Sequence, residues 1–318
     1  MQQLILKSLY VVARLKYPKL RRDLWYFVRD NYYCKLVQGR YVIRDYVLKK
    51  KYKVISYHGE FDQELRYVLP FAYWHHLNGT LGKTIAAQDT KEFYFFSSNH
   101  EERFKKRVWT ESYAHYNVPN MTHSNSYSFR NWAPVPYTEH FRNDIFVFDK
   151  PLLVIANKYN IEWDQPPINF LDIPTLDRII RDYGSTYQIV YNRPLPSQIV
   201  QDNSETMQLN EHAWLRETHP SVLLMDDLYT RYYPSVVNNY NHLQLMVYAN
   251  CSHFISMHGG TAALASCFGG KNIILSDPNW GIEHHFNEYE NLFPNLSGAT
   301  ILHARNRADV LTHLSINY

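Results

Sequence analysis

The sequence predicts an α/β protein built from two Rossmann-like domains, and three observations support this fold class. The chain has 318 residues, and two domains are expected because one compact domain usually holds roughly 100–200 residues. Short apolar runs alternate with helical segments, which is typical of parallel sheets covered by helices. The alternation restarts near residue 148. We therefore expect an N-terminal domain at 1–148 and a C-terminal domain at 149–318.

The N-terminal domain is expected to start its sheet with a buried strand and a long helix. Residues 52–58 (YKVISYH) predict a strand that runs into the turn residue Gly59. Residues 61–77 predict a helix with a kink at Pro70. The other expected elements are short strands at 82–87 and 92–97 and a long connector at 117–140.

The C-terminal domain shows the alternation most clearly. Residues 151–159 (PLLVIANKY) predict a buried strand. Residues 172–184 predict a helix with Asp172 as its N-cap, Pro174 in its first turn and Gly184 as its C-cap. Further strands are expected at 186–194, 221–227, 253–260 and 271–277, with helices at 241–251, 261–270 and 304–314. This order is typical of a doubly wound, Rossmann-like sheet.

Composition and charge exclude several classes of protein. The hydrophobic content of 45% rules out global disorder, and no apolar run is long enough to predict a transmembrane helix. The cysteines are Cys34, Cys251 and Cys267. Their odd number favours a reducing compartment over a disulfide framework, and their spacing fits no zinc site. We expect a cytoplasmic protein without a metal.

The positive charge is concentrated at the N-terminus. Residues 1–53 hold 14 Lys and Arg against three acids, a net charge of +11, and the rest of the chain carries −8. Residues 2–18 predict a basic amphipathic helix that ends near Pro18. Such a helix could lie on an anionic bilayer or pack on its own domain. We expect residues 1–51 to be a basic extension that contacts a membrane surface peripherally.

The strongest local motif is His258-Gly259-Gly260-Thr261, between an apolar strand and a helix of small residues. The glycines let the backbone approach a ligand closely, and the N–H groups of a helix start favour phosphate. Thr261 can cap the helix or donate to a phosphate oxygen. The turn predicts a phosphate or diphosphate site, with tight strand-to-helix packing as the alternative. GxGxxG and GxxxxGK[ST] are absent, so dehydrogenases and P-loop kinases are disfavoured.

This sequence of elements resembles the donor-binding half of GT-B glycosyltransferases, especially those of cell-surface and viral polysaccharide synthesis. Segments 156–180 and 56–76 agree with the same pattern, and the resemblance covers roughly residues 52–315. It implies two Rossmann-like domains facing across a cleft, with a nucleotide-sugar donor in the C-terminal domain. It also implies a glycan or lipid-linked glycan acceptor in the N-terminal domain. The resemblance implies catalysis without a metal, and no DxD triplet occurs in the sequence.

Candidate donor-binding residues follow the strands of the second domain. Besides the HGGT turn, Lys158 and Asn160 follow its first strand, and Arg193 follows its second. The alternative is that these side chains are ordinary polar groups of the surface beside loops. Glu283 follows strand 271–277, and the resemblance implies that it holds sugar or ribose hydroxyls of the donor. The type of nucleotide, UDP or GDP, stays open, and no other cofactor is expected.

Candidate bases cluster after the first strand of the N-terminal domain. Transfer with inversion needs a group that takes the proton of the acceptor hydroxyl. Glu60 is the first choice because Gly59 permits an exposed turn, and Asp62 and His58 follow. The alternative for the two acids is capping of helix 61–77.

Two other functions remain open from the sequence. One is a different transferase of the same shape, such as a pyruvyl transferase. The other is a non-enzymatic protein that binds polyanions or nucleic acid through the basic N-terminus, for which affinity would depend strongly on salt. That reading leaves the HGGT turn unexplained, so no nucleic-acid partner is expected.

Overall fold

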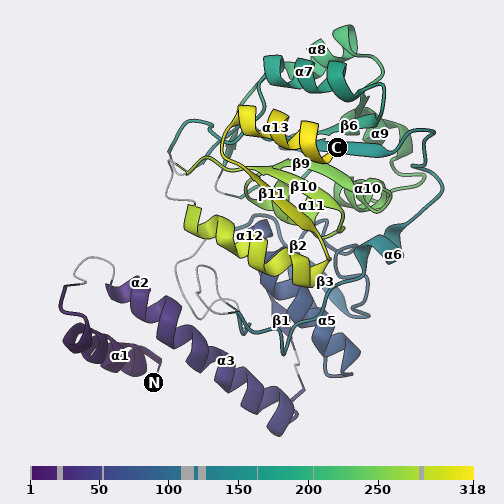
Figure 1. Cartoon of the computed structure of the whole chain (residues 1–318). Coiled ribbons are helices and arrows are strands. Elements are labelled where there is room, and N and C mark those ends of the chain that lie inside the picture. Colours follow the sequence, from purple (N-terminus) through teal and green to yellow (C-terminus); the bar gives the residue numbers. More distant parts are fainter. Residues whose placement is uncertain are drawn as a thin grey trace.

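The computed structural model describes residues 2–19, 24–51, 54–108, 118–120, 127–162, 164–202, 204–278 and 283–318. Figure 1 shows an N-terminal pair of long helices that projects from two α/β units. Every strand pairing within the two main sheets is parallel, which confirms the α/β class. One hydrophobic cluster contains side chains of both units, and the boundary near residue 148 stays a prediction.

The larger unit contains a six-stranded sheet in the order β11-β10-β9-β4-β6-β8. Its strands are β4 (Leu152–Ala156), β6 (Gln188–Asn192), β8 (Leu223–Leu224), β9 (His253–Met257), β10 (Lys271–Leu275) and β11 (Thr300–Ala304). Numbered within the unit, the order is 3-2-1-4-5-6, which is that of doubly wound nucleotide-binding sheets. The strand order reverses between β4 and β9, and such sheets bind ligands at this point.

Helices cover both faces of this sheet. They are α7 (Ile173–Tyr183), α8 (Glu211–Thr218), α9 (Met225–Tyr232), α10 (Tyr240–Tyr248), α11 (Gly260–Ser266), α12 (Glu283–Leu296) and α13 (Arg307–Asn317). Successive strand residues point to opposite faces, so Leu153 packs in one hydrophobic cluster and Val154 in the other. The predicted helix 172–184 is confirmed: the Asp172 side chain accepts from Thr175 N, and Gly184 is the C-cap.

The smaller unit holds a three-stranded parallel sheet of β1 (Ile55–Ser56), β2 (Thr84–Ala87) and β3 (His100–Phe104). The predicted helix 61–77 is confirmed as α4 (Phe61–Gln63), η3 (Glu64–Val68) and α5 (Leu69–Leu77). Its π-helical part, η3, lies directly before Pro70. Pro70 cannot donate to the Arg66 carbonyl one turn earlier, and Trp132 Nε1 donates to that oxygen at 3.0 Å instead.

Three predicted strands were wrong in extent or place. Residues 92–97 form turns rather than a strand, with Phe93 and Tyr94 buried, and the strand lies at β3 instead. A short apolar run looks alike in a buried turn and in a strand. The strand predicted at 221–227 is confined to β8, and the described part of the strand predicted at 52–58 is confined to β1, two residues each. Asp226 and Asp227 lie in the first turn of α9, where acids are favourable.

The last strand and its preceding helix were missed. Strand 271–277 was expected to be the last of the sheet, but β11 follows it at the edge. No helix was predicted between this strand and residue 304, but Glu283 begins helix α12. Part of the connector predicted at 117–140 lies outside the described residues, and α6 (Tyr137–Phe141) interrupts the rest.

The N-terminal extension forms a helical hairpin. The helix predicted at 2–18 is confirmed as α1 (Gln2–Lys16). The second arm, which was not predicted, runs through α2 (Leu24–Val28), η1 (Arg29–Tyr33), α3 (Cys34–Val42) and η2 (Ile43–Val47). Leu6 and Ala13 are buried against this arm. None of the helices in the described parts of the chain is long and apolar enough to cross a bilayer.

Candidate functional site

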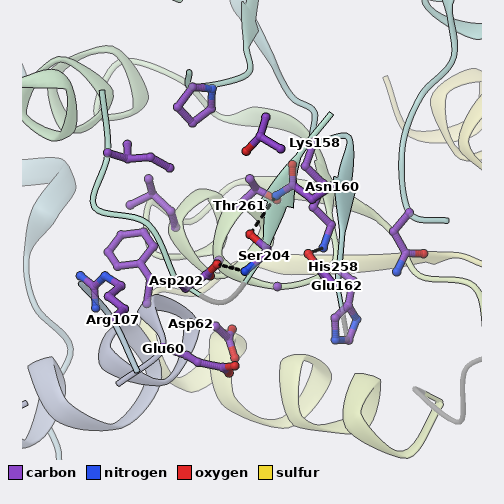
Figure 2. A pocket seen from close by; sticks show the side chains of 18 of the residues that line it. Glu60, Asp62, Arg107, Lys158, Asn160, Glu162, Asp202, Ser204, His258 and Thr261 are labelled. Atoms are coloured by element: carbon purple, nitrogen blue, oxygen red, sulfur yellow. Dashed lines mark hydrogen bonds and ion pairs between the residues drawn. The ribbon is translucent and has the colours of Figure 1, made fainter. Parts of the chain in front are cut away.

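A cavity of about 530 Å³ lies where the two α/β units meet, at the carboxyl ends of β4 and β9. Most of the residues predicted for the site line it, and they come from both units (Figure 2). These residues are Glu60, Asp62, Lys158, Asn160, Arg193, His258, Gly259, Gly260 and Thr261. The structure therefore brings together side chains that are far apart in the sequence.

The glycine turn after β9 forms one wall of the cavity. Gly259 has φ +108°, a conformation that side-chain-bearing residues rarely adopt, and a Cβ there would lie 3.6 Å from Lys158 Nζ. A Cβ on Gly260 would lie 3.2 Å from Cδ1 of Phe61 in the smaller unit. A side chain is therefore disfavoured at Gly259 by the backbone conformation and at Gly260 by the contact with Phe61. The turn thus lies against the opposite wall.

The polar groups of the turn are partly engaged within the protein. Thr261 Oγ1 donates to Met257 O at 2.5 Å, so its proton stays inside the turn. The N-cap position of α11 is Gly259, without a capping side chain. His258 Nδ1 lies 2.9 Å from Ser276 Oγ, and the ring packs edge-on against Tyr289. A ligand in the cavity would meet mainly backbone here.

Lys158 and Asn160 line the cavity beside this turn (Figure 2). Lys158 Nζ donates to Glu162 Oε1 at 2.6 Å, and its side chain is 15% exposed. Asn160 Nδ2 donates to Ser204 Oγ at 3.3 Å. Asn160 belongs to β5 (Asn160–Ile161), which pairs antiparallel with β7 (Glu205–Thr206) beside the cavity. The Lys158 ammonium group is thus placed next to Gly259.

Arg193 also lines the cavity, but its guanidinium group points to a buried partner. It forms an ion pair with Glu211, at the start of α8, and Nη1 donates to Met207 O at 3.3 Å. Both side chains are almost fully buried. The positive charge is therefore balanced inside the protein before any ligand binds.

Glu60 lies on the opposite wall, before the first turn of α4 (Figure 2). Its carboxylate makes no capping hydrogen bond to the helix. Burial, and then the nearby negative charges of Asp62 and Asp202, raises the pKa of Glu60 to about 7. Glu60 can therefore exchange a proton near neutral pH.

Asp62, in contrast, is held by fixed partners. Arg66 Nε donates to Asp62 Oδ1 at 3.1 Å, and Arg66 Nη2 donates to the other oxygen. The hydroxyl of Tyr289, on α12, donates to Asp62 Oδ1 at 2.9 Å. Gly259 N donates to the same hydroxyl at 3.1 Å, which connects the acid wall to the glycine turn.

Arg66 is the centre of a buried network that sequence reasoning missed. Besides Asp62 it pairs with Glu288 of α12 and donates to Tyr67 at 2.7 Å. The i, i+4 spacing of Asp62 and Arg66 on a predicted helix was a signal for part of it. Glu288 and Tyr289 carried no such signal, because helix α12 itself was not predicted.

Two predicted site residues lie elsewhere or outside the description. His58 does not line the cavity in the part of the chain that the structure describes; its ring packs on Phe104, 5.1 Å between centroids. Glu283 is the first residue of α12, and its side chain lies outside the described residues. The role assigned to Glu283 stays a prediction.

The described residues contain no group of three or more side chains suited to hold a metal ion. All three cysteines are buried thiols, and burial raises the pKa of Cys251 to about 12. The thiols are therefore poor candidates for nucleophiles.

No protein-family model matches this sequence, and no curated protein matches it either. Three solved structures from Escherichia coli resemble its fold distantly. The heptosyltransferase WaaC with ADP is 13% identical, over 88% of this chain and 77% of its own, with a TM-score of 0.40. The ADP-heptose LPS heptosyltransferase II is 8% identical, over 83% and 97%, with a TM-score of 0.47. WaaC with ADP-2-deoxy-2-fluoro heptose is 11% identical, over 88% and 77%, with a TM-score of 0.38.

Proposed function

We propose that this protein is a glycosyltransferase that moves a sugar from a nucleotide-diphosphate sugar to a glycan acceptor. One observation carries the proposal: a single cavity joins a glycine turn and a lysine to a proton-exchanging carboxylate from the other unit. The turn and the lysine follow β9 and β4, the strands at which the sheet order reverses. This arrangement suits a reaction in which a diphosphate leaves and a hydroxyl attacks.

The diphosphate is assigned to the wall of Gly259 and Lys158. The backbone can approach the phosphates closely at Gly259, and the Lys158 ammonium group lies next to it. Lys158 would exchange Glu162 for the diphosphate as the donor binds. Fixed charges of this kind stabilise the leaving group, so we propose that the reaction needs no metal.

The acceptor is assigned to the wall of Glu60. A general base works best when its pKa lies near the working pH, and the pKa of Glu60 is about 7. For transfer with inversion, Glu60 takes the proton of the acceptor hydroxyl as its oxygen bonds to the anomeric carbon. The bond from that carbon to the diphosphate breaks, and the diphosphate leaves on the side of Lys158. Asp62, which Arg66 and Tyr289 hold in place, contributes negative charge that tunes Glu60.

We also propose that the helical hairpin (residues 2–19 and 24–47) contacts an anionic membrane surface, where a lipid-linked acceptor would be found. Val11, Val12 and Leu15 are 57%, 61% and 79% exposed on the face of α1 that points away from the second arm. Lys7, Arg14 and Lys16 lie on the same helix. Exposed apolar side chains among basic ones suit the interface of an anionic bilayer.

The central test is thermal melting of the full chain with ADP, UDP, GDP, CDP and their sugar derivatives, with and without EDTA. At least one nucleoside diphosphate should raise the melting temperature, and EDTA should leave that shift unchanged. The Gly259→Ala variant should lose the shift, because its new Cβ strains the turn beside Lys158.

Gly79→Ala is the matched control, since Gly79 also has a positive φ, +63°, with no atom within 4 Å of its added Cβ. It should keep the nucleotide shift, because Gly79 lies outside the cavity. Absence of any nucleotide-dependent shift in the melting temperature of the unchanged protein would contradict the proposed function.

A further inference from the structure

We infer that the Glu60 wall of the cavity binds a sugar acceptor that presents hydrogen-bond donors and carries no carboxylate or phosphate beside the reacting hydroxyl. The inference rests on the proposed function, because it names the class of acceptor for the same cavity. Two independent observations carry it: the balance of charge around the cavity, and a buried amide oxygen without a partner.

The charge balance of the cavity is negative on the acceptor side. The carboxylates of Glu60, Asp62, Glu162 and Asp202 line it. Its lining arginines pair with buried acids: Arg66 with Asp62 and Glu288, Arg107 with Glu64, and Arg193 with Glu211. The other Lys or Arg among the described lining residues is Lys158, which pairs with Glu162 beside the glycine turn.

Asp202 holds its negative charge in a fixed place. Asp202 Oδ1 accepts from Ser204 N at 2.7 Å, and Figure 2 shows this bond beside the cavity. Arg107 N donates to the carbonyl of the preceding residue, Gln201, at 3.0 Å, which ties the segment to the smaller unit. An anionic acceptor would therefore meet a carboxylate, that of Asp202, which is anchored to the backbone, and like charges at close range weaken binding.

Gln63 supplies the second observation. Its residue is 4% exposed, it lines the cavity, and its Oε1 has no hydrogen-bond partner. Its Nε2 donates to Glu60 Oε2 at 3.5 Å, so the amide lies next to the proposed base. Buried polar atoms are almost always paired, so the orphaned carbonyl oxygen of a residue that lines the cavity is a candidate to accept from a ligand.

Together these groups define what the acceptor must offer. One hydroxyl donates to Glu60 and is the one that reacts, and a neighbouring donor on the same sugar reaches Gln63 Oε1. Both protein atoms are acceptors, so the sugar must supply the protons. A carboxylate or phosphate at the second position offers no proton to Gln63 at neutral pH and adds repulsion from Glu60 and Asp202.

The experiment measures binding of simple sugars to the full chain by saturation-transfer NMR. The probes are the methyl glycosides of glucose and galactose and their matched uronic acids, each with and without the nucleotide that raises the melting temperature. At least one neutral glycoside should bind, and its uronate should bind at least tenfold more weakly. Equal or tighter binding of the uronate, or no binding of either neutral glycoside, would overturn the inference.

Three variants locate the effect. Gln63→Met should weaken binding of the neutral glycoside about tenfold. It should change the melting temperature little, because Oε1 has no partner in the protein and the bond from Nε2 to Glu60 is long, at 3.5 Å. Gln198→Met is the control, since Gln198 bonds to Leu195 N and Asp226. It should lower the melting temperature and leave sugar binding unchanged. Asp202→Asn should reduce the difference in affinity between the neutral glycoside and its uronate.

Unchanged sugar affinity in Gln63→Met would also contradict the inference. So would an unchanged difference in affinity between the neutral glycoside and its uronate in Asp202→Asn. The nucleotide shift is measured in the same samples and tests the proposed function separately. If the nucleotide raises the melting temperature but the sugar selectivity is wrong, only the assignment of the acceptor is contradicted. If no nucleotide raises the melting temperature, the proposed function itself is contradicted.

Discussion

The two walls of the cavity are built in different ways. The wall of the larger unit consists of a backbone turn, Gly259 and Gly260, and one lysine whose carboxylate partner is partly exposed. The wall of the smaller unit rests on a buried network in which Arg66 joins Asp62 to Glu288 of α12. The first wall can exchange partners with a ligand, whereas the second is fixed before any ligand arrives. The difference suits the proposed site, in which the first wall binds the leaving group and the second carries Glu60 beside the fixed carboxylate of Asp62.

The largest expected effect is on the fixed wall. Arg66→Met leaves two buried carboxylates without their cation, and removing one partner of a buried ion pair costs about 3–5 kcal/mol of unfolding free energy. Urea denaturation of the full chain measures this loss. Arg216→Met is the control, because the Arg216 pairs with Asp226 and Asp227 are exposed and each is worth no more than about 1 kcal/mol. Equal losses in the two variants would show that the network does not hold the wall.

The same difference explains what could be predicted from the sequence. The glycine turn lies between a strand and a helix that are adjacent in the chain, so its residues, and Lys158 after β4, were visible as a local pattern. Glu60 was found because a strand end and a glycine precede it. The rest of the network was not predicted. Glu288, which pairs with Arg66, and Tyr289, which donates to Asp62, lie more than 200 positions away on a helix with no strong start signal. Tertiary contacts of that range leave no periodic trace in a single sequence.

The hairpin and the short strands show the same limit at the level of the fold. The first helix was predicted from its basic amphipathic pattern, but the second arm contains π-helical turns at 29–33 and 43–47 that shift its apolar periodicity. Strands of two residues, such as β1 and β8, are defined by their neighbours in the sheet rather than by their own sequence. The doubly wound class of the larger sheet could be predicted from the sequence, whereas the lengths of these short strands could not.

The second prediction separates the chemistry of the two walls. Glu60→Gln removes the proposed base and should reduce sugar transfer at least about 100-fold while leaving the nucleotide shift intact. In the unchanged protein, kcat/KM should rise with pH through about 7, because only the ionised carboxylate can take the proton. Transfer assays with the stabilising nucleotide sugar, from pH 5.5 to 8.5, measure both. A variant that transfers at the original rate would show that the base is elsewhere.

The stability of the same variant provides an internal control. The folded-state pKa of Glu60 is raised above its ordinary value of 4.5, so the folded protein favours the protonated form. The stability contributed by this proton is fully present below pH 4.5 and is lost as the pH rises through about 7. Glu60→Gln carries no such proton, so its melting temperature relative to the original protein should increase from pH 5 to pH 8. No change in that difference would mean that Glu60 is not buried as described.

The third prediction concerns the exchangeable wall. Lys158→Met keeps the length of the side chain and removes the charge, so nucleoside diphosphate affinity should fall by about 2 kcal/mol, roughly thirtyfold. The salt dependence of binding should fall with it. Lys150→Met is the control, since Lys150 bonds to Gly184 O on the surface. Isothermal titration with the stabilising nucleotide at two salt concentrations measures both changes. Equal affinity in the two variants would remove Lys158 from the donor site.

The smallest expected effect lies outside both walls, at the helical hairpin. Val11→Glu/Leu15→Glu replaces two exposed apolar side chains of α1 by acids, and two such charges near an anionic surface cost about 2 kcal/mol together. Partition onto phosphatidylserine vesicles should therefore fall at least about tenfold. Val147→Glu/Ile316→Glu is the matched control, because these side chains are 62% and 73% exposed on the rest of the molecule. If both double variants partition alike, the hairpin is not the membrane contact, and the basic charge of the N-terminus needs another explanation. If only the hairpin variant is released while its nucleotide shift persists, donor binding and membrane contact belong to separate parts of one chain.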